Sequence, residues 1–98
     1  MGIPENIKVG GMTYNIVFTE EPCETNQEAD GIVVFNKQVI RLKSNMAPEY
    51  TEAVLIHELI HIITKHAAVD FGDNDESITE AMAHVLHQIL KDNDIRFD

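Results

Sequence analysis

Hydrophobic positions alternate with polar ones in the first half of the chain and recur every three or four residues in the second half. The alternating stretch 7–18 is interrupted by Gly10-Gly11, which predicts two strands joined by a tight turn. Residues 32–35 and 39–42 flank Asn36-Lys37, whose asparagine favours the positive φ of a tight turn. We therefore expect two antiparallel hairpins ahead of the helical region.

Two longer segments have the helical period. Residues 53–63 place most of their leucines and isoleucines on one side of a helix, and His57 and His61 on the opposite side. Pro48 predicts the start of this helix, because proline fits the first helical turn. Residues 77–91 predict a second amphipathic helix. Its apolar side consists of Ile78, Met82, Val85, Leu86 and Ile89.

Hairpins followed by helices predict an α+β fold, in which a small twisted antiparallel sheet packs against the first helix and a second C-terminal helix follows. A chain of 98 residues with 44% apolar content can build one modest core, so we expect a single domain over residues 1–98. Residues 39–43 are the strand expected at a free sheet edge, where an extended peptide can add itself as another strand. Arg41 and Lys43 can equally protect that edge from aggregation.

Residues 57–61 read His-Glu-Leu-Ile-His inside the first helix. Histidines four residues apart lie on one helix face, so the imidazoles of His57 and His61 can bind a single metal ion. Glu58 projects beside that ion, where its carboxylate can take a proton from a metal-activated water and pass it to a leaving amine. This pattern predicts a zinc metallopeptidase with Glu58 as general base.

Catalytic zinc sites usually have three protein ligands, so a third donor must come from elsewhere in the chain. Helix geometry leaves four candidates on the polar side of the second helix: Glu76, Glu80, His84 and His87. Ser77 and Glu80 also match a capping box, a role that competes for the Glu80 carboxylate. His66 lies about 180° around the helix from His57 and suits a dipole partner at the helix end.

These segments resemble the IrrE/ImmA-like metallopeptidases, a small gluzincin-type family of bacteria and their mobile elements. The resemblance covers about residues 31–90 and rests on three features: the strand pair at 31–43, the HExxH helix with the apolar lead-in 53–56, and Glu80 followed by small and apolar residues. It implies one zinc ion held by His57, His61 and Glu80.

The resemblance also implies a narrow protein substrate, such as a transcriptional repressor, and a phage or mobile-element gene. The chain departs from the family at two positions. Ile60 stands where many relatives have glycine, and His84 stands where many gluzincins have an acidic residue that supports a histidine ligand. The sequence does not determine which side chains would hydrogen-bond the oxyanion that forms when water attacks a peptide carbonyl. The nominated candidates are Tyr50, His84 and His87.

Composition narrows the class of partner. A net charge of -10 with seven Lys and Arg residues opposes direct nucleic-acid binding. Cys23, the single cysteine, excludes an internal disulfide, and its acidic neighbours should raise its pKa. We find no secretory signal and no apolar run long enough to span a membrane, so we expect a cytoplasmic monomer.

A second class of function is compatible with the same pattern. The domain can be a catalytically silent metal-binding or protein-interaction module that recruits a partner through its sheet edge without cleaving it. Glu58 favours catalysis, because a binding module has no need of a general base. A third alternative, a helical interaction protein with merely exposed histidines, predicts no specific metal binding.

Overall fold

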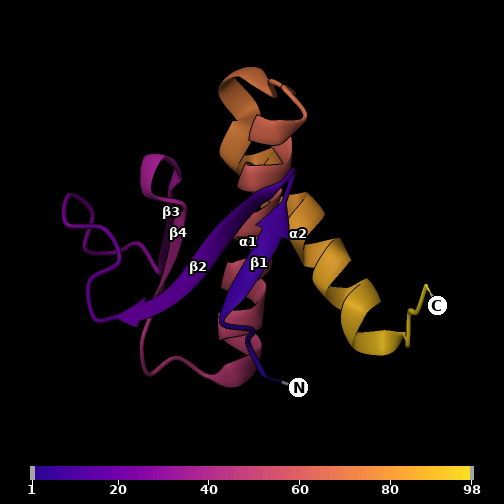
Figure 1. The fold of residues 1–98 in the computed structure, drawn as a ribbon, viewed down its shortest axis with the longest axis horizontal. Coiled ribbons are helices and arrows are strands. Elements are labelled where there is room, and N and C mark those ends of the chain that lie inside the picture. The colour runs from indigo at the N-terminus through magenta and orange to yellow at the C-terminus, as the bar shows by residue number, and fades with distance from the viewer. Residues whose placement is uncertain (1, 98) are drawn as a thin grey trace.

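The computed structural model describes residues 2–97, which form a four-stranded sheet against helix α1, with helix α2 packed beside α1 (Figure 1). The strands are β1 (Asn6–Val9), β2 (Met12–Thr19), β3 (Gly31–Val34) and β4 (Val39–Lys43). The helices are α1 (Pro48–His66) and α2 (Asp75–Asp92), and short 3-10 turns span Phe35–Lys37 and Gly72–Asn74. This architecture confirms the predicted α+β class.

The sheet is mixed and has the strand order β1-β2-β4-β3. Both predicted hairpins form, but β2 and β4 are parallel, with Asn15 opposite Val39 and Thr19 opposite Lys43. The expectation of an antiparallel sheet is therefore wrong for this central pair. The parallel pair arises because residues 20–30 carry the chain from the end of β2 to the outer strand β3, and β4 then returns alongside β2.

Strand β4 lies between β2 and β3, so the prediction that residues 39–43 form a free edge is wrong. The alternate residues Ile40 and Leu42 of β4 are both 0% exposed, as expected for a strand with a neighbour on each side and α1 against one face. Within residues 2–97 the edge strands are β1 and β3.

The two hairpin turns differ in which residues have a positive φ. Gly10 and Gly11 have φ of +57° and +84°, which glycine adopts without steric cost, and they form the predicted tight turn. In the second hairpin Gln38, rather than Asn36, has positive φ (+53°). The 3-10 turn Phe35–Lys37 intervenes and ends where the Gln38 N–H donates to the Phe35 carbonyl at 3.1 Å.

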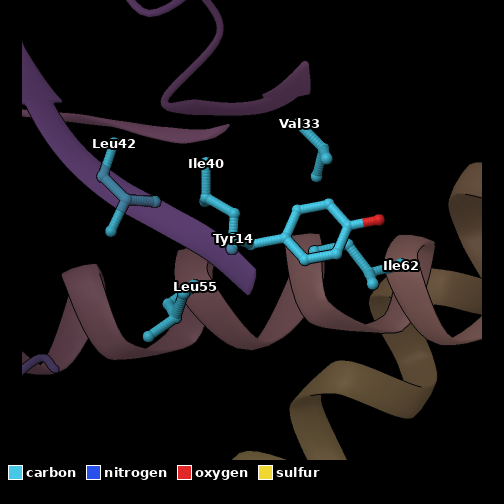
Figure 2. Close-up of a cluster of buried hydrophobic side chains, with 6 residues drawn as sticks. All are labelled: Tyr14, Val33, Ile40, Leu42, Leu55 and Ile62. Carbon is cyan, nitrogen blue, oxygen red and sulfur yellow. The ribbon is translucent and has the colours of Figure 1, made fainter. Parts of the chain in front are cut away.

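The main core lies between the sheet and α1, and Figure 2 shows the strand side chains directed at that helix. Its buried members are Tyr14, Val33, Ile40, Leu42, Leu55 and Ile62. Burying each side chain of this size contributes about 1.5–3 kcal/mol. The edge strand β3 approaches α1 closely at Gly31, because a Cβ there would lie 2.7 Å from Cγ1 of Val54.

Helix α2 packs on α1 with a different face from the one expected. Ala83 (3% exposed) packs with Ile56 and Ile60 of α1, and Thr79, one turn earlier on α2, is 0% exposed. By contrast Val85, in the middle of the predicted apolar side, is 53% exposed. Of the predicted apolar side, Leu86 does pack against this cluster, whereas Met82, Val85 and Ile89 are exposed. Small side chains let two helix backbones approach closely, which accounts for the inward position of Thr79 and Ala83.

The predicted start is confirmed for α1 and wrong for α2. Pro48 occupies the first turn of α1 as predicted, whereas α2 begins at Asp75 with Asn74 at its N-cap. The capping-box prediction is wrong, because Ser77 lies inside the first turn and its hydroxyl donates to the Asn74 carbonyl at 3.1 Å. Glu80 is therefore not engaged in a cap. No helix within residues 2–97 is both long and apolar enough to cross a bilayer.

Candidate metal centre

His57 and His61 lie side by side on α1, with ring centroids 5.0 Å apart. Their side chains are 13% and 21% exposed, so each ring is mostly buried but keeps an open side. The spacing of four residues in an unbroken helix accounts for this pairing.

The carboxylate of Glu76, in the first turn of α2, lies against both rings. Its Oε1 is 2.7 Å from His61 Nε2 and 3.4 Å from His57 Nε2, while its Oε2 is 3.2 Å from His57 Nε2. Partial desolvation opposes ionisation, but the two histidines together lower the pKa of the Glu76 carboxyl. The Nε2 atoms of both rings thus converge on one carboxylate.

The Nδ1 atoms face other carboxylates. His57 Nδ1 is 3.1 Å from Glu80 Oε2, and His61 Nδ1 is 3.7 Å from Asp75 Oδ2. A carboxylate behind a histidine ligand fixes the orientation of the ring and increases its basicity. Glu80, which the family resemblance implied as a zinc ligand, therefore lies on the opposite side of the His57 ring from Glu76.

Glu58 is 8% exposed and lines the same cleft as the two histidines. Its burial raises the pKa of the carboxyl above the ordinary glutamate value, although the neighbouring His57 and His61 oppose the rise. A carboxylate whose pKa is raised holds a proton more readily, which suits a group that must accept a proton and release it again.

These residues line a cleft of about 830 Å³ between β3, α1 and the start of α2. Gly31, Ile32 and Val33 of the edge strand form one wall. The Lys43 N–H donates to the Asp30 carbonyl at 2.8 Å, which identifies these two residues as a hydrogen-bonded antiparallel pair. Since bonding alternates along such a strand, the N–H and C=O groups of Gly31 and Val33 point away from β4.

The remaining histidines lie outside this centre. His87 bonds to Glu52 of α1, with Nε2 to Oε1 at 3.1 Å, and His66 bonds to Tyr14. Among residues 2–97, the group whose donor atoms lie within 4.8 Å of one another comprises His57, His61 and Glu76. Neither His84 nor His87 belongs to it.

Tyr50 and Cys23, which also line the cleft, make hydrogen bonds that the sequence did not predict. Tyr50, nominated as an oxyanion donor, donates its hydroxyl to Asp30, and this hydrogen bond is the main reason that its pKa is raised. The Cys23 thiol was expected to have a raised pKa, but hydrogen bonding to Thr25 lowers it. The expectation is wrong because the effect of the adjacent Glu24 charge is smaller than that of this hydrogen bond.

The chemistry of the three donors is compatible with a bound metal ion. Two imidazole nitrogens and one carboxylate oxygen are a common donor set of catalytic zinc sites. Tetrahedral zinc with bonds of about 2.1 Å holds its donors roughly 3.4 Å apart. The 3.4 Å between Glu76 Oε1 and His57 Nε2 equals that value, whereas the 2.7 Å between Glu76 Oε1 and His61 Nε2 is a direct hydrogen-bond distance.

Comparison of the chain with protein-family models, with curated proteins and with solved structures found no match.

Proposed function

We propose that the protein is a zinc-dependent metallopeptidase that hydrolyses peptide bonds in an extended protein segment. The observation that carries the proposal is the convergence of His57 Nε2, His61 Nε2 and the Glu76 carboxylate beside the buried Glu58. A metal held there supplies a Lewis acid that acidifies water and polarises a carbonyl.

The chain's own residues have distinct tasks in this reaction. Glu58 accepts the proton of the attacking water and donates it to the amine that leaves, so that its carboxylate returns to the starting state. The raised pKa of Glu58 makes its carboxylate a stronger base and therefore favours the first of these transfers. Glu80 orients the His57 ring through its Nδ1 atom at 3.1 Å. The Asp75 carboxylate lies 3.7 Å from His61 Nδ1 and adds a favourable charge beside that ring.

The third ligand in this proposal is Glu76, whereas the family resemblance implied Glu80. Glu76 lies opposite the Nε2 atoms of both histidines, while Glu80 contacts only the Nδ1 atom of one. A metal bound to both Nε2 atoms needs its third donor on the side of the rings to which these two atoms point. Substitution of Glu76 and substitution of Glu80 should therefore change the metal affinity by different amounts.

Substrate binding in the proposal uses the edge strand β3 in place of the buried β4. The outward N–H and C=O groups of Gly31 and Val33 can pair with an extended peptide, which then lies along the cleft that holds Glu58. Antiparallel addition is favoured, because antiparallel pairs are slightly more stable than parallel ones.

Zinc titration of five purified proteins tests the metal site: wild type, His57→Ala, Glu58→Gln, Glu76→Gln and Glu80→Gln. Wild type and Glu58→Gln should bind one zinc with equal affinity, and His57→Ala should bind none. Glu76→Gln should lose most of the affinity, whereas Glu80→Gln should lose about 10- to 100-fold, as expected for a ring-orienting carboxylate. Equal binding by Glu76→Gln and wild type would restore Glu80 as the candidate ligand.

Hydrolysis is tested separately by incubating the zinc-loaded protein with unfolded proteins and mass-analysing the products. Cleavage should stop on chelation, return with zinc, and be absent in Glu58→Gln. The free edge of β3 also supports a second candidate function, a module that binds an extended segment without cleaving it. Tight zinc binding without any hydrolysis by wild type would favour that alternative.

A further inference from the structure

Along the side of the cleft formed by β3 and α1, the two ends carry side chains of opposite charge, while Asp75, Glu76 and Glu80 line the cleft from α2. At the start of β3, Asp30 accepts a hydrogen bond from Tyr50, which belongs to the first turn of α1. At the end of β3, the Lys65 ammonium lies 4.6 Å from the centroid of the Phe35 ring. All four residues line the cleft.

The candidate metal ligands His57, His61 and Glu76 lie between these ends. His57 is seven residues after Tyr50 and eight residues before Lys65 on α1, so it is about 10 to 12 Å along the helix from each. From Asp30 to Phe35 the neighbouring strand spans roughly 16 Å, which an extended peptide covers in about five residues. A peptide lying along β3 can therefore reach both charges with its reacting bond in the middle.

The direction of the peptide determines which charge each of its ends meets. Strand β3 runs from the Asp30 end toward the Lys65 end. A peptide added antiparallel to β3 places its amino-terminal part beside Lys65 and its carboxy-terminal part beside Asp30. Lys65 is the one lysine or arginine among the cleft-lining residues of the region 2–97, so an acidic side chain finds its cation only at that end.

We propose, on the basis of the proposed function, that the cleft selects segments with an acidic side chain before the reacting bond and a basic side chain after it, about five residues apart. Charge order, rather than net charge, is then the specificity signal. A segment with the reverse order places its acidic side chain beside Asp30 and its basic side chain beside Lys65, and both contacts are repulsive.

The test uses zinc-loaded Glu58→Gln protein and two fluorescein-labelled peptides of about ten residues. Both peptides have the same composition and two charged positions, one with glutamate toward the amino end and lysine toward the carboxy end, and one with these exchanged. Because the two peptides have the same net charge, the acidic protein as a whole attracts or repels both equally. This contribution therefore cancels when their affinities are compared. The first peptide should bind about five- to tenfold more tightly at low salt, and the ratio should shrink as salt is added.

Matched variants separate charge from structure. Asp30→Asn removes the charge but keeps an oxygen that can accept the Tyr50 hydrogen bond, and it should reduce the preference to about two- to fivefold. Lys65→Gln should reduce it similarly, and the double variant should abolish it. Tyr50→Phe removes the hydrogen bond but keeps the charge, and should leave the preference unchanged.

The outcomes distinguish this inference from the function on which it rests. If the preparation holds no zinc, the proposed function fails and the inference fails with it. If it holds zinc but binds both peptides equally, or binds neither, the inference alone is overturned. A preference that survives the double variant also overturns it.

Discussion

The hydroxyl of Tyr14 and Nε2 of His66 are joined by a 2.9 Å hydrogen bond between residues 52 positions apart. Tyr14 is 2% exposed near the start of β2, and His66 is the last residue of α1. The bond thus fixes the end of the helix that carries His57 and His61 to the sheet. Gly10 lies against the same ring, because a Cβ there would be 2.6 Å from His66 Nδ1.

Tyr14→Phe should lower the free energy of unfolding by about 1 kcal/mol, the net contribution of one hydrogen bond. His66→Ala should lower it by a similar amount, and the double variant should cost less than the sum of the two. Urea unfolding of all four proteins measures this coupling. Strictly additive losses would contradict the claim that the bond stabilises the fold.

Gly31→Ala should destabilise the protein by about 1–3 kcal/mol, because its methyl group would overlap Cγ1 of Val54 and crowd Cδ2 of Leu42. Thermal unfolding measures the loss. Val54→Ala removes the overlapping group. The destabilisation caused by Gly31→Ala should therefore be smaller in the Val54→Ala background than in the wild-type background. Gly2→Ala, where a Cβ would have no neighbour within 4 Å, is the control and should be neutral.

Two buried threonines should respond oppositely to replacement by valine. Thr79 Oγ1 has no hydrogen-bond partner in the described part of the chain, so Thr79→Val should stabilise the protein by about 1 kcal/mol. The Thr51 hydroxyl donates to the Ala47 carbonyl at 3.0 Å, so Thr51→Val should destabilise it by a similar amount. Denaturant unfolding at one pH compares them. A loss of stability in Thr79→Val would indicate that its hydroxyl has a partner in solution.

Glu52 stabilises the protein in a pH-dependent way. Hydrogen bonding from His87, together with Lys91, lowers the pKa of the Glu52 carboxyl in the folded state. The unfolded chain therefore binds the proton more readily, and the contribution is present above the ordinary pKa of about 4.5 and is lost as pH falls through the lower folded-state value.

Glu52→Gln should accordingly be less stable than wild type at pH 7, and the difference should narrow as pH falls below about 4.5. Thermal unfolding from pH 7 to pH 3 tests this, with Glu24→Gln in the exposed β2–β3 loop as a control for loss of a negative charge. A constant difference across this range would show that the stabilisation does not depend on ionised Glu52.

Local patterns were sufficient to predict the parts of the site that lie within one element. His57, Glu58 and His61 are on one helix because their spacing and the apolar period around them are local properties. Gly10-Gly11 similarly forms the predicted turn, because only adjacent residues are needed to close it.

Contacts between distant elements could not be predicted in the same way. The face of α2 that meets α1 depends on how closely two helices can approach, which favoured Thr79 and Ala83, with Leu86, over Met82, Val85 and Ile89. That choice also sets which acidic side chain of α2 lies opposite the two Nε2 atoms, namely Glu76.

The sequence by itself determined the helix that carries His57, Glu58 and His61, both hairpins and the α+β class, because each follows from periodicity over neighbouring residues. Only the tertiary structure decided that β4 is central, that β3 is the edge beside the cleft, and that Glu76 and Glu80 lie on different sides of His57. These features depend on burying apolar surface between segments far apart in the chain, and no local pattern encodes which of the competing arrangements buries it best.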